Sequence, residues 1–149
     1  MARRVRYPEP PAGPVFVLDA QGLSLLADDD RRMMARLQLA TREEFIPTIS
    51  AISIVEQRRQ GKPGQRLAWL RSQLTVVPVT EDIADAAAVL LDATGLTGHQ
   101  CVVDAVVVAT AASATGPAKV VSSDGSHIPA LCSKSASANR TSPVEWVRV

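Results

Sequence analysis

The sequence predicts an α/β fold with three layers, α/β/α, in which helices cover both faces of a mainly parallel sheet of four to five strands. Short continuous apolar runs, such as Val15-Phe16-Val17-Leu18, are typical of strands that are buried on both faces. These runs alternate along the chain with segments whose apolar residues have helical spacing. Strands that are separated by helices form parallel sheets with helices on both faces, so this alternation determines the fold class.

The composition indicates one globular domain without a membrane segment. The chain has 149 residues, of which 46% are hydrophobic and 3% aromatic, so the core must be mainly aliphatic. A formal net charge of +1 predicts no strong nonspecific attraction to nucleic acid, although it leaves room for a local basic patch. No apolar run has the length of a membrane span, and the basic N-terminus is not followed by the apolar run of a secretory signal, so we expect a cytoplasmic protein. Two cysteines are too few for a disulfide framework.

The N-terminal segment differs in composition from the rest of the chain. Residues 1–14 contain four prolines and a basic start, which predicts a flexible or extended arm rather than a helix. The domain itself is expected to cover residues 15–149. Its predicted strands cover residues 15–18, 45–48, 74–79, 118–122 and 144–149, the last of them a weak edge strand.

The predicted helices lie between these strands and cover residues 20–27, 32–39, 51–60, 65–73, 81–94, 101–115 and 128–131. Asp28-Asp29-Asp30 is interpreted as the cap of the second helix, with a metal site as the alternative. Ser50 is expected to cap the third helix, and the turn-like sequence Gly61-Lys62-Pro63-Gly64 to end it. Gly95 is expected to end the helix over residues 81–94.

The segment 101–113 is almost wholly apolar and contains a single acid, Asp104. A helix that is apolar all round is a buried helix. Thr97-Gly98-His99 just before it is expected to form the loop and helix start, so that Asp104 lies in the first turn of the helix over residues 101–115. There the carboxylate either only helps to start the helix or points into a cleft and holds a cation.

Acids from distant parts of the chain are expected to meet at one edge of the sheet. Asp19 and Asp124 each stand just past the carboxyl end of a predicted strand, where ligands bind in such folds. Glu56 lies about two turns into a helix that leaves the same edge, although a plain salt bridge is the alternative for it. Together with Asp104 these carboxylates would repel one another and raise their own pKa values unless a cation lay between them.

The chemistry of these groups favours Mg²⁺ or Mn²⁺. Such ions prefer oxygen ligands, and they can activate water and stabilise charge on a phosphodiester. His99 and His127 are not spaced as a zinc pair, and no CxxC is present. The chain also contains no GxxxxGK[ST] and no GxGxxG, which excludes the usual nucleotide-binding loops.

Four segments resemble the motifs of the PIN-domain family, and within it the VapC-like ribonuclease toxins of toxin–antitoxin pairs. Residues 17–20 look like the first-strand motif, and Ser50 to Glu56 is similar to the segment S-x-x-x-x-x-E. Residues 103–111 look like the helix D-A-x-I-A-A-T-A, and residues 120–124 resemble the strand that ends in T-x-D. The likeness covers roughly residues 15–149, and its order and spacing are more specific than any single motif.

The resemblance implies a PIN-like fold and a metal-dependent endoribonuclease that acts as a toxin, dimerises and is blocked by an antitoxin protein. It implies an acidic metal site with a supporting hydroxyl, formed by Asp19, Glu56, Asp104 and Asp124 with Ser122. The chain departs from the family after Asp124, where Ser126 and His127 replace the usual acid and phenylalanine. The polar segment 133–142 is also atypical, and whether His127 touches substrate is left open.

Two other functions fit the same residues, namely a PIN-fold nuclease with a housekeeping role in RNA processing and a catalytically weak module for protein binding. The crowded acids argue against the second of these. Basic residues that could contact RNA phosphates, with a solvated surface role as the alternative, are Arg3, Arg4, Arg6, Arg58 and Arg59. Apolar residues that suggest a dimer surface are Leu23, Leu25, Leu26, Met33, Met34 and Leu37.

Overall fold

The computed structural model describes residues 9–57, 61–136, 140 and 142–149. Their centre is one five-stranded sheet with the strand order β3-β2-β1-β4-β5. All four strand pairings are parallel, which confirms the predicted fold class. The strands are β1 (Val15–Leu18), β2 (Ile46–Ser50), β3 (Thr75–Val77), β4 (Ala118–Ser122) and β5 (Glu145–Arg148).

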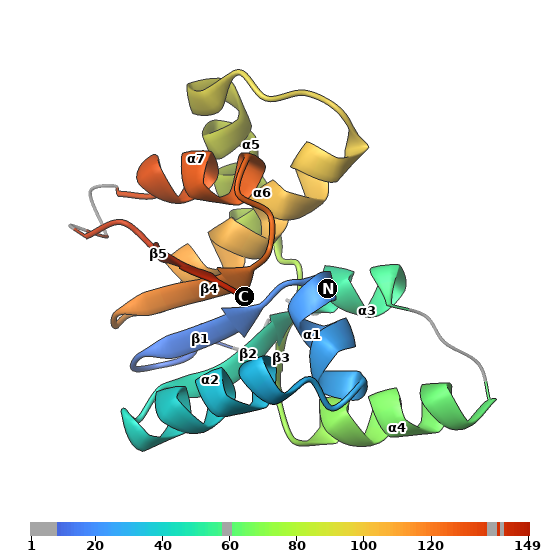
Figure 1. The fold of residues 1–149 in the computed structure, drawn as a ribbon. Helices are drawn as coiled ribbons and strands as arrows, with labels where there is room; N and C mark the ends of the chain where they lie inside the picture. The colour runs from blue at the N-terminus through green and yellow to red at the C-terminus, as the bar shows by residue number, and fades with distance from the viewer. Residues whose placement is uncertain (1–8, 58–60, 137–139, 141) are drawn as a thin grey trace, which may run out of the picture.

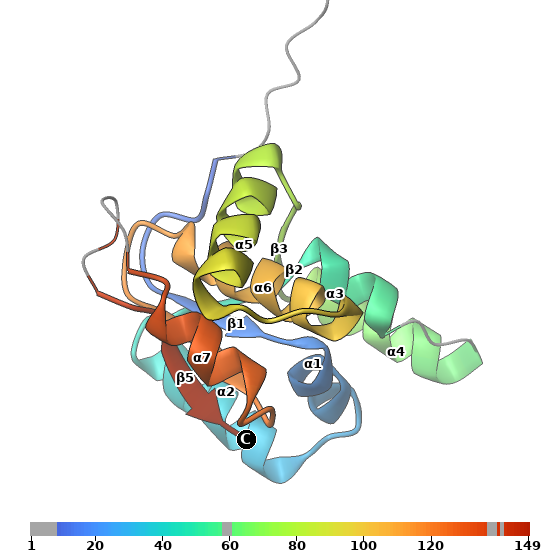
Figure 2. The same ribbon diagram turned by 90° about the horizontal axis from the view of Figure 1, so that it is seen from above.

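Helices cover both faces of this sheet (Figure 1). They are α1 (Ala20–Ala27), α2 (Arg31–Arg42), α3 (Ala51–Glu56), α4 (Gly61–Ser72), α5 (Glu81–Thr94), α6 (His99–Ala112) and α7 (His127–Ser133). The helices α5, α6 and α7 lie together over one face, as the view from above shows, and α1, α2 and α4 lie on the other (Figure 2). No helix among the described residues has the length and apolar character that a membrane span needs.

The central strand β1 is buried on both faces, which explains its continuous apolar sequence. Val15 and Val17 belong to the core under α5, α6 and α7. Phe16 and Leu18, which alternate with them, belong to the second core, under α1, α2 and α4. Each residue of β1 therefore packs against a helical layer, whichever way its side chain points.

The prediction that residues 61–64 form a break is wrong, because Gly61 is the first residue of α4. Proline is tolerated in the first turn of a helix, where its missing N–H would have had no partner, so Pro63 fits inside α4. The preceding helix α3 ends at Glu56, earlier than the predicted residue 60, and residues 58–60 lie outside the described part. Turn-like composition thus marks the start of a helix here.

The predicted position of Asp104 in the first turn of its helix is also wrong. The helix α6 begins at His99, after Gly98 with φ 101°, and extends two residues further toward the N-terminus than predicted. Asp104 therefore lies in the second turn, where backbone N–H groups already have partners within the helix. A role in starting the helix does not explain this buried acid.

The acidic run before α2 is a helix cap, as predicted. Asp30 is the N-cap, and its Oδ1 accepts a hydrogen bond from Met33 N at 2.8 Å. Asp29 instead forms an ion pair with Arg66 on α4. Asp30 therefore caps the first turn of α2, and Asp29 connects the residues before this helix to α4.

Replacing Asp30 with Ala is expected to lower the free energy of unfolding by about 1 kcal/mol, because Met33 N loses its acceptor. Asp30→Asn removes the charge but keeps a capping oxygen, so its effect should be a few tenths of a kcal/mol. Urea denaturation of both variants measures the difference. Equal losses in the two would show that charge, not capping, is what stabilises this turn.

The six apolar residues of α1 and α2 that suggested a dimer surface do not form a free surface, with one exception. Leu23, Leu26 and Met33 are at most 6% exposed, and Leu25 and Leu37 pack against the same core. They fill the layer between the sheet and α4, so the sequence argument for a dimer through these side chains is wrong. Met34 is the exception at 38% exposure.

The polar segment 133–142 contains buried anchors among its described residues. Arg140 is 9% exposed and donates hydrogen bonds to three backbone carbonyl oxygens at the end of α6. Its Nε lies 3.2 Å from Ala112 O, and its Nη2 lies 2.9 Å from Ala114 O and 2.6 Å from Gly116 O. Ser135, also buried, accepts a hydrogen bond from Val144 N at 2.6 Å.

Candidate functional site

The candidate site lies where the strand order of the sheet reverses. The strands β1 and β4 are neighbours at the point where the sheet divides into two halves. The strands β2 and β3 lie beyond β1, and β5 lies beyond β4. Asp19 follows β1 directly, and Asp124 comes two residues after β4. Crevices at such a switch point, outside the carboxyl ends of the strands, are the usual ligand sites of parallel sheets.

Asp19 is held by both of the elements that it joins. Its Oδ1 accepts a hydrogen bond from Gly22 N at 2.7 Å, which makes it the N-cap of α1. Burial raises the pKa of Asp19, and hydrogen bonds from Ser122 and Gly22 partly offset this increase. Ser122 is fully buried, and its Oγ also accepts a hydrogen bond from Asp124 N at 3.0 Å. The serine thus connects two of the acids.

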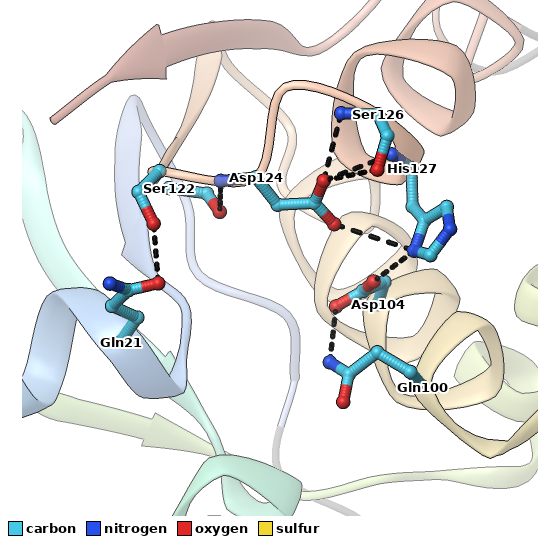
Figure 3. A network of polar contacts seen from close by, with 8 residues as sticks. Gln21, Gln100, Asp104, Ser122, Asp124, Ser126 and His127 are labelled. Carbon is cyan, nitrogen blue, oxygen red and sulfur yellow. Dashed lines mark hydrogen bonds and ion pairs between the residues drawn. The ribbon is translucent and has the colours of Figure 1, made fainter.

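Asp104 and Asp124 converge on the ring of His127 (Figure 3). The Nδ1 atom of His127 lies 3.3 Å from Asp104 Oδ2 and 3.4 Å from Asp124 Oδ2. Asp104 comes from α6, Asp124 from the loop after β4 and His127 from the first position of α7. One ligand atom from each of these residues lies within 4.8 Å of the other two, so together they could hold a metal ion.

The pKa values show how burial and mutual repulsion act on these acids. Burial, and then the charge of Asp124, raise the pKa of Asp104 to about 6 against the hydrogen bonds from Gln100 and His127. Burial also raises the pKa of Glu56, with further contributions from the charges of Asp104 and Asp19. All four predicted acids are therefore close enough to interact electrostatically.

Asp124 is the exception, because its pKa is lowered. Burial acts to raise the pKa, but the hydrogen bonds from Ser126 and His127, with the charge of His127, outweigh it. The Oδ1 atom accepts from Ser126 N at 2.8 Å, Ser126 Oγ at 2.7 Å and His127 N at 3.2 Å. This carboxylate is stabilised in its ionised form and fixed at the start of α7.

Glu56 approaches the cluster from the solvent side. It is the last residue of α3, and its side chain is exposed. Ile52, Val55 and Glu56 have the spacing of one helix face, but this face is not a buried stripe, since Val55 is 62% exposed and Ser53 is the buried residue. The short helix packs against both α1 and α6 and thereby buries a different side.

The sequence prediction included the four acids and Ser122, and the structure brings these residues to one edge of the sheet. The prediction left the role of His127 open, and this residue contacts both Asp104 and Asp124. Its spacing of three residues from Asp124, at a helix start, was the only signal in the sequence. The arginines considered as RNA contacts, Arg3, Arg4, Arg6, Arg58 and Arg59, lie outside the described residues.

Comparison with known proteins identifies the class of fold. No family model matches the chain, and no curated protein matches it in sequence. Solved structures do match, and they confirm the PIN-like α/β/α fold that the motifs resemble, in the form found in VapBC toxin–antitoxin complexes.

Three of these structures share the fold over nearly their whole length. VapBC2 from Rickettsia felis, bound to a DNA fragment from its promoter, matches with a TM-score of 0.66 and 14% identity, over 91% of this chain and 98% of that one. A toxin–antitoxin complex from Klebsiella pneumoniae matches with a TM-score of 0.59 and 19% identity, over 87% of this chain and 98% of that one. DNA-bound VapBC from Salmonella typhimurium matches with a TM-score of 0.60 and 17% identity, over 90% of this chain and 97% of that one.

Proposed function

We propose that this protein is a metal-dependent endoribonuclease that hydrolyses RNA phosphodiester bonds and is the toxin of a toxin–antitoxin pair. The observation that carries the proposal is the cluster at the switch point of the sheet. Asp104, Asp124 and His127 place three ligand atoms within 4.8 Å of one another, and Asp19 and Glu56 add negative charge beside them. The fold shared with toxin–antitoxin complexes supports the same assignment.

The donor set fits a divalent cation such as Mg²⁺ or Mn²⁺. Carboxylate oxygens are the ligands these ions prefer, and the neighbouring charges of Asp104 and Asp124 repel each other without one. When bound, the ion would polarise a phosphodiester and lower the pKa of a water molecule. Ser122 would hold Asp19 and Asp124 in place through its two hydrogen bonds.

The remaining acids would act on the attacking water. Asp104 and Asp124 would bind the cation, with Asp19 beside them either directly or through water. Glu56 is exposed and faces the charges of Asp104 and Asp19, so its carboxylate can orient a water that enters from solvent. Its raised pKa favours acceptance of a proton from that water.

The test is cleavage of a panel of structured RNAs by the full chain with Mg²⁺, with Mn²⁺ and with excess EDTA. Cleavage is expected with either ion. The activity should be lost in EDTA and should return when the ion is added back in excess. Cleavage that continues unchanged in EDTA would exclude this mechanism.

We also propose that the protein has a protein partner and acts in the cytoplasm, where its RNA substrate would be present. We expect the product of a small neighbouring gene to bind the protein and to inhibit cleavage, and the protein itself to form a homodimer. Pull-down and light scattering at micromolar concentration measure the two interactions. A cleaving monomer that no neighbouring gene product inhibits would instead favour a housekeeping nuclease.

The stability of the metal-free protein is expected to depend on Asp104 between about pH 4 and pH 6. The pKa of Asp104 is about 6 in the folded chain, against an ordinary 3.8, so the folded state retains a proton that the unfolded state has released. The resulting stabilisation is complete below about pH 4 and is lost as the pH rises through about 6.

At pH 7 without divalent ions, Asp104→Asn should therefore be more stable than the wild type, by about 1–2 kcal/mol. The advantage should shrink as the pH falls to 4. Urea denaturation of both proteins in EDTA across this range measures the difference. A difference that does not change with pH would contradict the assigned cause.

A further inference from the structure

We propose that His127 is a direct ligand of the cation, so that the site offers two carboxylate oxygens and one imidazole nitrogen and binds Mn²⁺ more tightly than Mg²⁺. The inference rests on the proposed function, because it concerns the same site. It adds a ligand that the acidic motifs do not contain, and it predicts which ion the site selects.

The first argument is the position of the His127 Nδ1 atom. It lies 3.3 Å from Asp104 Oδ2 and 3.4 Å from Asp124 Oδ2. Both distances exceed the 2.9–3.0 Å or so of a typical N–H···O hydrogen bond, so Nδ1 is shared between the two oxygens. Adjacent ligands around one cation, with bonds of about 2.1 Å at right angles, lie about 3.0 Å apart. The Nδ1 atom therefore lies within a few tenths of an ångström of this spacing from each of the two oxygens.

The second argument is that each carboxylate has one oxygen engaged and one directed to the centre (Figure 3). Asp124 uses Oδ1 for three hydrogen bonds from Ser126 and His127 at the start of α7. Asp104 uses Oδ1 for a hydrogen bond from Gln100 Nε2 at 3.3 Å. The Oδ2 atoms are the two that face Nδ1. Such outer contacts orient metal ligands in known sites.

The third argument is that the helix which carries His127 is firmly placed. Ile128 and Leu131 of α7 are both 0% exposed and belong to the core under α5 and α6. The backbone N of His127 is itself bound to Asp124 Oδ1. The ring is thus presented from a rigid element, with a side-chain exposure of 33% that leaves room for an ion and its water ligands.

An imidazole ligand changes the ion that the site prefers. Mg²⁺ binds mainly through carboxylates, phosphates and water, and it demands near-ideal octahedral oxygen geometry. Imidazole nitrogen instead suits first-row transition ions. For Nδ1 to bind, it must carry no proton, which places the ring proton on Nε2.

The decisive measurement is pulsed electron paramagnetic resonance on the full chain loaded with Mn²⁺ alone. Modulation from a directly bound imidazole nitrogen is expected, and labelling of histidine with ¹⁵N should change it. The chain has only two histidines, and the other, His99, is exposed at the start of α6. The modulation should therefore persist in His99→Ala and disappear in His127→Ala.

Calorimetry gives a second readout that does not depend on cleavage. His127→Ala should weaken Mn²⁺ binding by at least about tenfold and change Mg²⁺ binding much less, whereas His99→Ala should change neither. Mn²⁺ binding to the wild type without nitrogen modulation would overturn the inference, even if the variant failed to fold. In that event, EDTA-sensitive RNA cleavage would still support the proposed nuclease, and cleavage that survives EDTA would refute it separately.

Discussion

Replacement of Asp104 with Asn is expected to lower metal-dependent RNA cleavage about a hundredfold or more, which corresponds to about 3 kcal/mol of activation free energy. Asp104 is 5% exposed, and its Oδ2 atom faces His127 and the Asp124 side of the cluster. Asparagine keeps the size of the side chain and an oxygen for Gln100, but it removes the negative charge that would hold the cation. The loss should therefore appear in catalysis while the fold remains intact.

The measurement is the initial rate of cleavage of one structured RNA by the two proteins, with saturating Mn²⁺ and with EDTA. Asp92→Asn is the matched control, because Asp92 is an exposed acid on α5 outside the cluster. It should cleave as fast as the wild type. An Asp104→Asn variant that also keeps the wild-type rate would remove Asp104 from the proposed site.

Replacement of Arg140 with Met is expected to lower the free energy of unfolding by about 3 kcal/mol. Arg140 donates to the carbonyl oxygens of Ala112, Ala114 and Gly116, where α6 ends and the chain turns into β4. Methionine retains much of the side-chain length but no donor, so three carbonyl groups lose a partner in a mostly buried position. Burial also lowers the pKa of Arg140, which is consistent with a guanidinium withdrawn from solvent.

Urea denaturation with far-ultraviolet circular dichroism measures this loss. Arg36→Met on α2 is the control, because Arg36 is exposed and its replacement should change stability by less than about 0.5 kcal/mol. Equal effects of the two substitutions would show that the hydrogen bonds of Arg140 do not stabilise the end of α6.

The fold could be predicted because its signals are local. The helix over residues 81–94 and the strand over residues 15–18 have the predicted bounds, since an apolar stripe with a terminal Gly95 and an uninterrupted apolar run mark them clearly. The prediction of a break at residues 61–64 failed because glycine and proline are common both in turns and at helix starts. Which of the two applies depends on packing of the following helix, and the local residues do not contain that information.

Only those residues of the candidate site that follow strands could be predicted to lie together. Asp19 and Asp124 follow strands that a parallel sheet must place side by side, so their proximity follows from topology. The contact of His127 with Asp104 depends on how α7 packs on α6, across 23 residues of sequence. Arg140 had no recognisable signal at all, because its partners are backbone carbonyls 24 to 28 residues earlier, which any amino acid supplies.

The pairing of β1 with β4 has a consequence for the order in which the protein is made. It joins Val15 to Ala118, so the strand at the centre of the sheet is synthesised about a hundred residues before its partner. Asp124 and His127 come later still, and contacts this distant in sequence form slowly. A growing chain on the ribosome therefore has no complete acidic cluster while most of its helices are already present. An enzyme that cleaves RNA would thus remain inactive beside the RNA from which it is translated until nearly the whole chain has emerged.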